Sequence, residues 1–201
     1  MLVSTFEVLV KPQFPKLSSG PNVPPVVADL AKITRNVIQG YFLTIANVNF
    51  FPLTVSVVFT VKFPKGGIPK DFTDFLSAVD ISGINLLPTN PLAPKLVPET
   101  QEDKARLTVT IPANTTGLLI LQPNILKHGI LKEANFEARG YVEIFLSSLS
   151  GSNEATLLVT PEHRGTFYKD INGATPADIG LDQIAYPLPV SNGGVFVLSN
   201  S

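Results

Sequence analysis

The sequence contains no cysteine, no tryptophan and only two histidines among its 201 residues. Without cysteine the chain has no disulfide, no thiolate metal site and no cysteine nucleophile. The histidines, His128 and His163, lie far apart in the sequence and do not match the ligand spacing of a zinc site. We therefore expect no metal centre and no cofactor.

Charge is also scarce. Charged residues make up 15% of the chain and the net charge is −1, whereas charged residues are roughly 25% of an average soluble domain. The fifteen lysines and arginines are scattered, so the sequence predicts no nucleic-acid-binding surface. No run approaches the ~20 apolar residues that a transmembrane helix needs. The first residues show no charged leader followed by a long apolar region, which favours a cytoplasmic location.

The hydrophobic share is nevertheless 44%, and the mean hydropathy is +0.26. Two explanations fit this combination. Either the core is large, or the surface contains apolar area that is covered by a partner or a ligand, because large exposed apolar patches are uncommon in monomers. A protein partner or a homo-oligomer is therefore expected.

Alternation with a period of two residues is the main structural signal. Within residues 51–61, every odd position is apolar and most even positions are small or polar. Successive side chains of a strand point to opposite faces, so this pattern predicts a strand with one buried face. It recurs along the chain between proline- and glycine-containing turns, and it predicts about nine short strands. We expect a single all-β domain over residues 1–201, a two-layer antiparallel sandwich of immunoglobulin or fibronectin type.

Four segments depart from this rhythm. Residues 1–25 hold one alternating piece and then five prolines, and are expected to form an irregular arm. Residues 26–38 fit either a helix or a strand, and their β-branched side chains favour a strand from about Ile33. Residues 71–82 have helical apolar spacing behind a potential N-cap, Asp71, and predict a short helix. Residues 87–98 contain four prolines and are expected to cross between the layers.

Two stretches, residues 43–55 and 110–116, resemble late-embryogenesis-abundant and other immunoglobulin-like stress or adhesion domains. Those domains carry an Asn-Pro-Asn turn where this chain has Asn47, Val48 and Asn49. The resemblance implies the sandwich fold and implies nothing about function, because one fold serves many functions.

The densest polar cluster is Glu162, His163 and Arg164, which directly follow a predicted strand. A carboxylate, an imidazole and a guanidinium together can bind an anion or transfer protons. The alternative is a tight turn at residues 161–165 in which Arg164 pairs with a nearby acid. A second polar group, residues 170–182, offers oxygen ligands for calcium, but the EF-hand pattern is not met and a turn explains these residues equally well.

Recognisable catalytic patterns are missing. The sequence contains no Gly-x-Ser-x-Gly elbow and no glycine-rich phosphate loop, so no catalytic residue is predicted. Three functional hypotheses remain. The first is a non-enzymatic module that binds another protein or itself. Phe42, Phe50 and Phe51 would form an apolar patch for this purpose if they point outward, but their alternative placement in the core is favoured. The second is a binder of small apolar ligands, and the third is a hydrolase or isomerase that uses Glu162, His163 and Arg164.

Overall fold

The computed structural model describes residues 1–14, 26, 34–81, 84–86, 93–127, 129–169 and 182–199. Within these ranges, none of the helices is long and apolar enough to cross a membrane. The described strands and short helices are β1 (Leu2–Pro12), β2 (Asn36–Asn47), β3 (Leu53–Val61), η1 (Phe72–Asp74), β4 (Phe75–Ile81), β5 (Ile84–Leu86), β6 (Val97–Pro98), β7 (Lys104–Ile111), β8 (Thr115–Pro123), α2 (Ile130–Glu133), β9 (Phe136–Leu146), η2 (Ser148–Ser150), β10 (Glu154–Tyr168), β11 (Asp182–Pro187), η3 (Ser191–Gly194) and β12 (Val195–Ser199).

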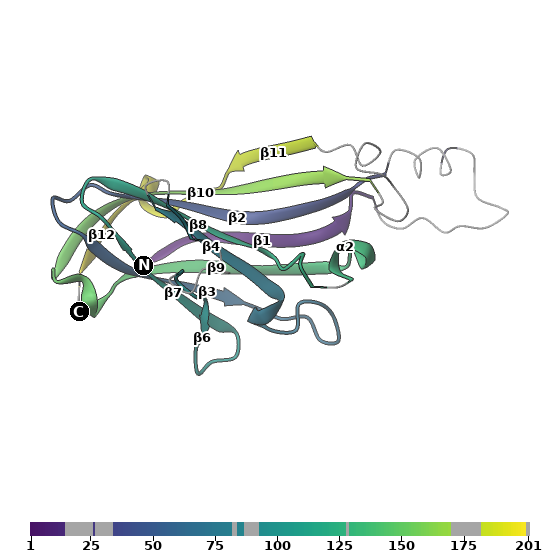
Figure 1. Cartoon of the computed structure of the whole chain (residues 1–201), viewed down its shortest axis with the longest axis horizontal. Helices are drawn as coiled ribbons and strands as arrows, with labels where there is room; N and C mark the ends of the chain where they lie inside the picture. Colours follow the sequence, from purple (N-terminus) through teal and green to yellow (C-terminus); the bar gives the residue numbers. More distant parts are fainter. Residues whose placement is uncertain are drawn as a thin grey trace.

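The sheet branches at β2. One edge of β2 pairs with β10 along its whole length, from Asn36 to Asn47. The other edge pairs with β1 up to Gln39 and with β8 from Tyr41 onward. One arm of the sheet therefore runs through β8, β4 and β5, and the other runs through β1, β9, β3, β7 and β6. The sheet curls through 255° into a half-barrel, and its concave side holds the core (Figure 1).

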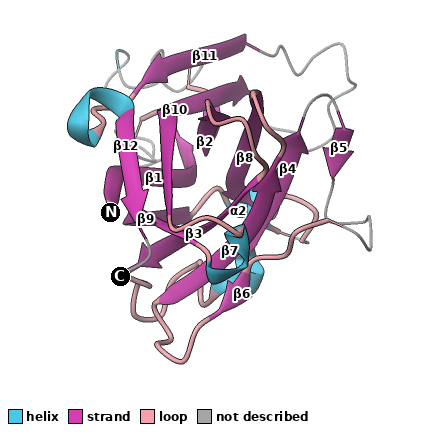
Figure 2. Ribbon diagram, turned by 90° about the vertical axis from the view of Figure 1, so that its left-hand side faces the viewer, coloured by secondary structure: helices cyan, strands magenta, loops and turns pink. Residues whose placement is uncertain are grey.

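The expected immunoglobulin-like sandwich is wrong, although the all-β class is confirmed. All pairings between the described strands are antiparallel and belong to one hydrogen-bonded sheet, in which β2 joins the two arms. A sandwich has two sheets without a ladder between them. Alternation marks which side of a strand is buried, and that side is buried equally well against a second sheet or inside one curled sheet. Figure 2 shows the strands surrounding the interior.

The helix expected at residues 71–82 is also wrong. Asp71 does cap a helical turn, and its carboxylate accepts from the backbone N–H of Thr73 at 2.7 Å, but that turn ends at Asp74. Strand β4 follows and pairs with β8. Phe75 and Val79 are four residues apart, a spacing that brings two side chains to one side of a helix and equally to one side of a strand. Here both are buried on the concave side of the strand.

The irregular regions are partly corrected. Residues 2–12 are not an arm but strand β1, paired with both β9 and β2. A strand does follow the ambiguous segment, and it begins at Asn36; the expected start at Ile33 lies outside the described residues. Residues 15–25 of the expected arm and residues 87–92 of the expected crossover also lie outside the described residues. The last two residues of the expected crossover, Val97 and Pro98, form β6.

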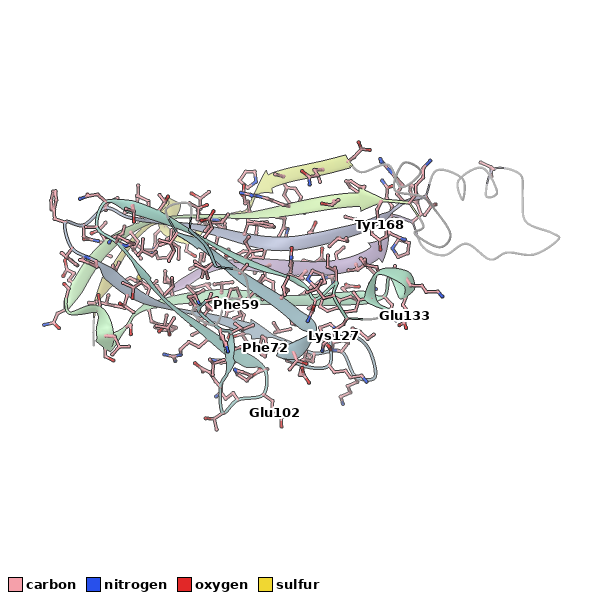
Figure 3. All side chains as sticks on the ribbon, in the orientation of Figure 1. Phe59, Phe72, Glu102, Lys127, Glu133 and Tyr168 are labelled. Atoms are coloured by element: carbon pink, nitrogen blue, oxygen red, sulfur yellow. The ribbon has the colours of Figure 1, made fainter. Side chains whose placement is uncertain are left out.

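Aromatic side chains from three strands meet at the centre of the core. The ring of Phe6 lies 5.5 Å from that of Tyr41 and 5.9 Å from that of Phe59. All three side chains are buried. Figure 3 labels Phe59 inside the curl. It also labels Tyr168 near the end of β10, where the Tyr168 hydroxyl donates to the carbonyl of Leu131 in α2. These contacts join β1, β2 and β3 inside the core and tie the end of β10 to α2.

The turn after β2 is organised by one buried amide. The Asn47 side chain is 1% exposed, and its Nδ2 donates to the carbonyls of Phe51, Ile111 and Pro112 at 2.9–3.0 Å. Its Oδ1 accepts from the backbone N–H of Asn49 at 3.0 Å and from the Asn49 side chain at 2.8 Å. Asn47 therefore ties the β2–β3 turn to the end of β7, and both polar atoms of its buried amide are hydrogen-bonded, as buried polar groups require.

Among the described glycines, Gly140 leaves the least room for a side chain. A Cβ atom at this position would lie 1.9 Å from the carbonyl oxygen of Thr60 and 3.0 Å from the ring of Phe6. We expect Gly140→Ala to lower the free energy of unfolding by about 3 kcal/mol or more, because overpacking forces the backbone of β3 to move. Urea denaturation measures this change.

Gly117→Ala is the matched control, because a Cβ there would meet only Ile111 and Ile81 side chains at ordinary contact distances of 3.5–3.6 Å. A similar loss of stability in both variants would contradict the close approach at Gly140.

Candidate functional site

The residues singled out by the sequence lie in the middle of β10, not in a turn. Glu162, His163 and Arg164 pair with β2 on one side and with β11 on the other. Consecutive strand residues point to opposite faces. The imidazole of His163 therefore lies on the concave side, 6% exposed, whereas Glu162 and Arg164 lie together on the outer side. The three side chains do not converge on one site.

On the concave side, His163 belongs to a closed ring of hydrogen bonds. Its Nε2 accepts from the backbone N–H of Glu7 at 3.0 Å, and its Nδ1 lies 3.2 Å from the hydroxyl of Tyr186. That hydroxyl donates to Oε1 of Gln39 at 3.0 Å. Nε2 of Gln39 donates to the carbonyl of Glu7 at 3.2 Å, which closes the ring.

The ring replaces backbone hydrogen bonds that the branching sheet cannot supply. The β1–β2 ladder ends at the pair Leu9 and Gln39, so Glu7 has moved away from β2. The donor and the acceptor of Glu7 would be left without a strand partner on this edge. His163 accepts from the N–H of Glu7, and Gln39 donates to its carbonyl. These bonds avoid the free-energy penalty of leaving buried backbone groups unpaired.

The ring assigns one tautomer to His163. Because Nε2 accepts a hydrogen bond from the backbone N–H of Glu7, the single ring proton must reside on Nδ1, which donates a hydrogen bond to the hydroxyl of Tyr186. Burial lowers the pKa of His163, and the negative charge of Glu7 opposes this only in part. Burial also raises the pKa of Tyr186. Both groups are therefore held neutral, which suits a structural network better than proton transfer.

On the outer side, an open hollow of about 520 Å³ lies over Gly40. The Arg164 guanidinium sits 4.5 Å from the centre of the Phe42 ring, and its Nε donates to Glu162 at 2.6 Å. A Cβ on Gly40 would lie only 3.1–3.2 Å from Gln122 and Leu121, so the glycine keeps this point of β2 close to β8. The charge of Arg164 is already paired, so the hollow presents amide and hydroxyl groups together with the Phe42 ring and aliphatic side chains such as Ile38 and Ile184.

The described residues contain no group of three or more His, Cys, Asp or Glu side chains placed to hold a metal ion. Of the calcium candidates, Asp170, Asn172 and Asp178 lie outside the described residues. Asp182 begins β11 and forms an ion pair with Arg35.

The sequence did not indicate the place where the curled sheet fails to close. Strand β12 pairs with β10 on one edge, and on its other side a hollow of about 440 Å³ separates it from β9. Met1 and Phe145 line this hollow together with Val197. Among the described strands β12 is therefore an edge strand, and only the tertiary structure shows that its unpaired edge faces this hollow.

Comparisons with protein-family models, curated proteins and solved structures found no match to this chain, so functional conclusions rest on its own geometry.

The neutral ring around His163 makes stability depend on pH. The pKa of His163 lies below its ordinary 6.5 in the folded protein, so the unfolded chain takes up the proton first as the pH falls. We expect the free energy of unfolding to drop below pH 6.5, with a slope of at most about 1.4 kcal/mol per pH unit, until the folded pKa is reached. Denaturation at a series of pH values measures this slope.

His163→Gln can still accept from Glu7 and does not titrate, so it should flatten the curve just below pH 6.5. His128→Gln is the control and should retain the slope. An unchanged slope in His163→Gln would show that the ring does not need a neutral imidazole.

Proposed function

We propose that this protein is a non-enzymatic binding module that self-associates through the free edge of β12. The observation that carries the proposal is an open, uncharged edge strand beside exposed aliphatic side chains. The separation of His163 from Glu162 and Arg164 supports binding over acid–base chemistry, because a general acid and base must reach one substrate atom together.

The backbone of β12 supports pairing with another strand. Among the described strands, β12 is hydrogen-bonded only to β10, at Glu154–Leu158. An unpaired edge presents a row of N–H and C=O groups that can bond to a further strand. Proteins usually protect such edges with charged residues, prolines or bulges. The sequence of β12, Val-Phe-Val-Leu-Ser, has none of these charges or prolines.

The side chains beside this edge are apolar. Val195, Val197 and Leu158 are 48%, 53% and 46% exposed, and Leu158 is directly opposite Val195 in the ladder. We call these three residues the edge patch. Phe50, at the tip of the β2–β3 turn, is 91% exposed. That turn lies at the same end of the molecule as β12 in Figure 1.

A second copy of the chain is the partner that fits this edge most simply. Two β12 strands related by a twofold axis pair in antiparallel fashion, which places each edge patch beside its own copy. The contact is free of charge repulsion, because residues 195–199 carry no ionisable side chain. The low content of charged residues, 15% overall, is consistent with a surface that is covered in an oligomer.

We expect the protein to sediment as a dimer and Val197→Lys to weaken the dimer at least about tenfold, or about 1.4 kcal/mol. The substitution removes apolar contact and places like charges opposite each other across the twofold axis. Analytical ultracentrifugation over a range of concentrations gives the dissociation constant.

Val97→Lys is a closely matched control, since Val97 is 58% exposed on another edge strand, β6. A wild-type protein that remains monomeric, or a dimer weakened equally by both substitutions, would contradict the proposal.

A further inference from the structure

A third hollow, at the C-terminal end of β1 and the N-terminal end of β9, combines an apolar floor with a positively charged rim, and we call it the cationic hollow. Its volume is about 710 Å³, within the ~300–1,000 Å³ typical of small-molecule sites. The floor is formed by Phe63, Pro64 and Ile68. The rim carries four cations, Lys11, Lys62, Lys65 and Arg139, and one carboxylate, Glu137.

The walls of the hollow are held in place by backbone hydrogen bonds. The loop after β3 bonds to β9 twice, from the N–H of Lys62 to the carbonyl of Arg139 at 3.4 Å and from the N–H of Glu137 to the carbonyl of Ile68 at 3.2 Å. The ring of Phe63 packs edge-on against Phe72 at 5.2 Å, so the floor is continuous with the core. The site is therefore built on the sheet and is not a gap between two independent loops.

Two of the four cations have no ion-pair partner among the described residues. Lys11 bonds to Glu137 at 2.8 Å, and hydrogen bonding from Lys11 is the main reason that the pKa of Glu137 is lowered. Arg139 bonds to Glu7 at 2.6 Å. When these two carboxylates are counted against the four cations, a formal charge of +2 remains on the exposed Lys62 and Lys65.

We propose that this hollow binds an amphipathic anion, a molecule with an aliphatic chain and one anionic head such as a long-chain carboxylate. The chain lies on Phe63, Pro64 and Ile68, and the head lies between Lys62 and Lys65. An apolar surface alone would accept neutral molecules, and a cationic surface alone would accept any small anion. The combination selects molecules that have both features. This site goes beyond the proposed self-association and does not involve β12.

The probe is decanoate below its micelle concentration, compared by calorimetry with decan-1-ol, which lacks the charge, and with acetate, which lacks the chain. We expect decanoate to bind about tenfold more tightly than decan-1-ol and acetate to show no measurable binding. Shortening the chain should weaken binding by up to about fourfold for each methylene removed. Added salt should weaken decanoate binding and leave decan-1-ol unaffected.

The variant Lys62→Gln/Lys65→Gln should reduce the affinity for decanoate about tenfold and leave decan-1-ol binding unchanged. Both side chains are exposed and form no ion pair with any described residue, so the fold should not change. Lys95→Gln/Lys169→Gln alters the net charge by the same amount outside the hollow and should bind decanoate as the wild type does.

Equal affinities for decanoate and decan-1-ol, or equal losses in both double variants, would overturn the proposal. Strong binding of acetate would also overturn it, because the site would then accept any small anion. None of these results bears on the β12 interface, which ultracentrifugation tests separately.

Discussion

The change of partner along one edge of β2 is the constraint on which the structure depends. At Gly40 this edge passes from β1 to β8, and the sheet divides into two arms that curl around a common core. The division leaves the backbone of Glu7 without a strand partner on that side. The side chains of His163 and Gln39 supply the missing hydrogen bonds. His163 can accept from the backbone N–H of Glu7 only if its imidazole is neutral. A buried polar ring is thus a direct consequence of the branching.

The surfaces with binding potential occur where the sheet is interrupted. The hollow over Gly40 lies where β2 changes partner, and the edge patch lies where β12 and β9 fail to close the curl. The cationic hollow lies where β3 ends and its loop turns back onto β9. Elsewhere the ladder satisfies the backbone and the side chains alternate between core and solvent. At these interruptions, backbone groups, cations and apolar side chains are therefore exposed and accessible to other molecules.

Much of the secondary structure could be predicted from alternation. A strand was expected at residues 51–61, and β3, which spans Leu53–Val61, confirms it. The helix at residues 71–82 was wrong because a four-residue spacing fits both a helix and a strand, and pairing with β8 decided between them. The cluster at residues 162–164 was noticed correctly as unusual. Its division between two faces was missed because residues 161–165 were interpreted as a turn and not as the middle of a long strand.

By itself the sequence determined the all-β class, most of the strands and the scarcity of charge, because these follow from composition and from side-chain periodicity within one segment. Only the tertiary structure decided that the strands form one curled sheet and that His163 faces inward while Arg164 faces outward. It also decided that Lys62 and Lys65 have no carboxylate partner within the described part of the chain. These features depend on which distant strands pair and where a ladder stops. Period-two alternation carries no information about either, since every pairing partner presents the same backbone groups.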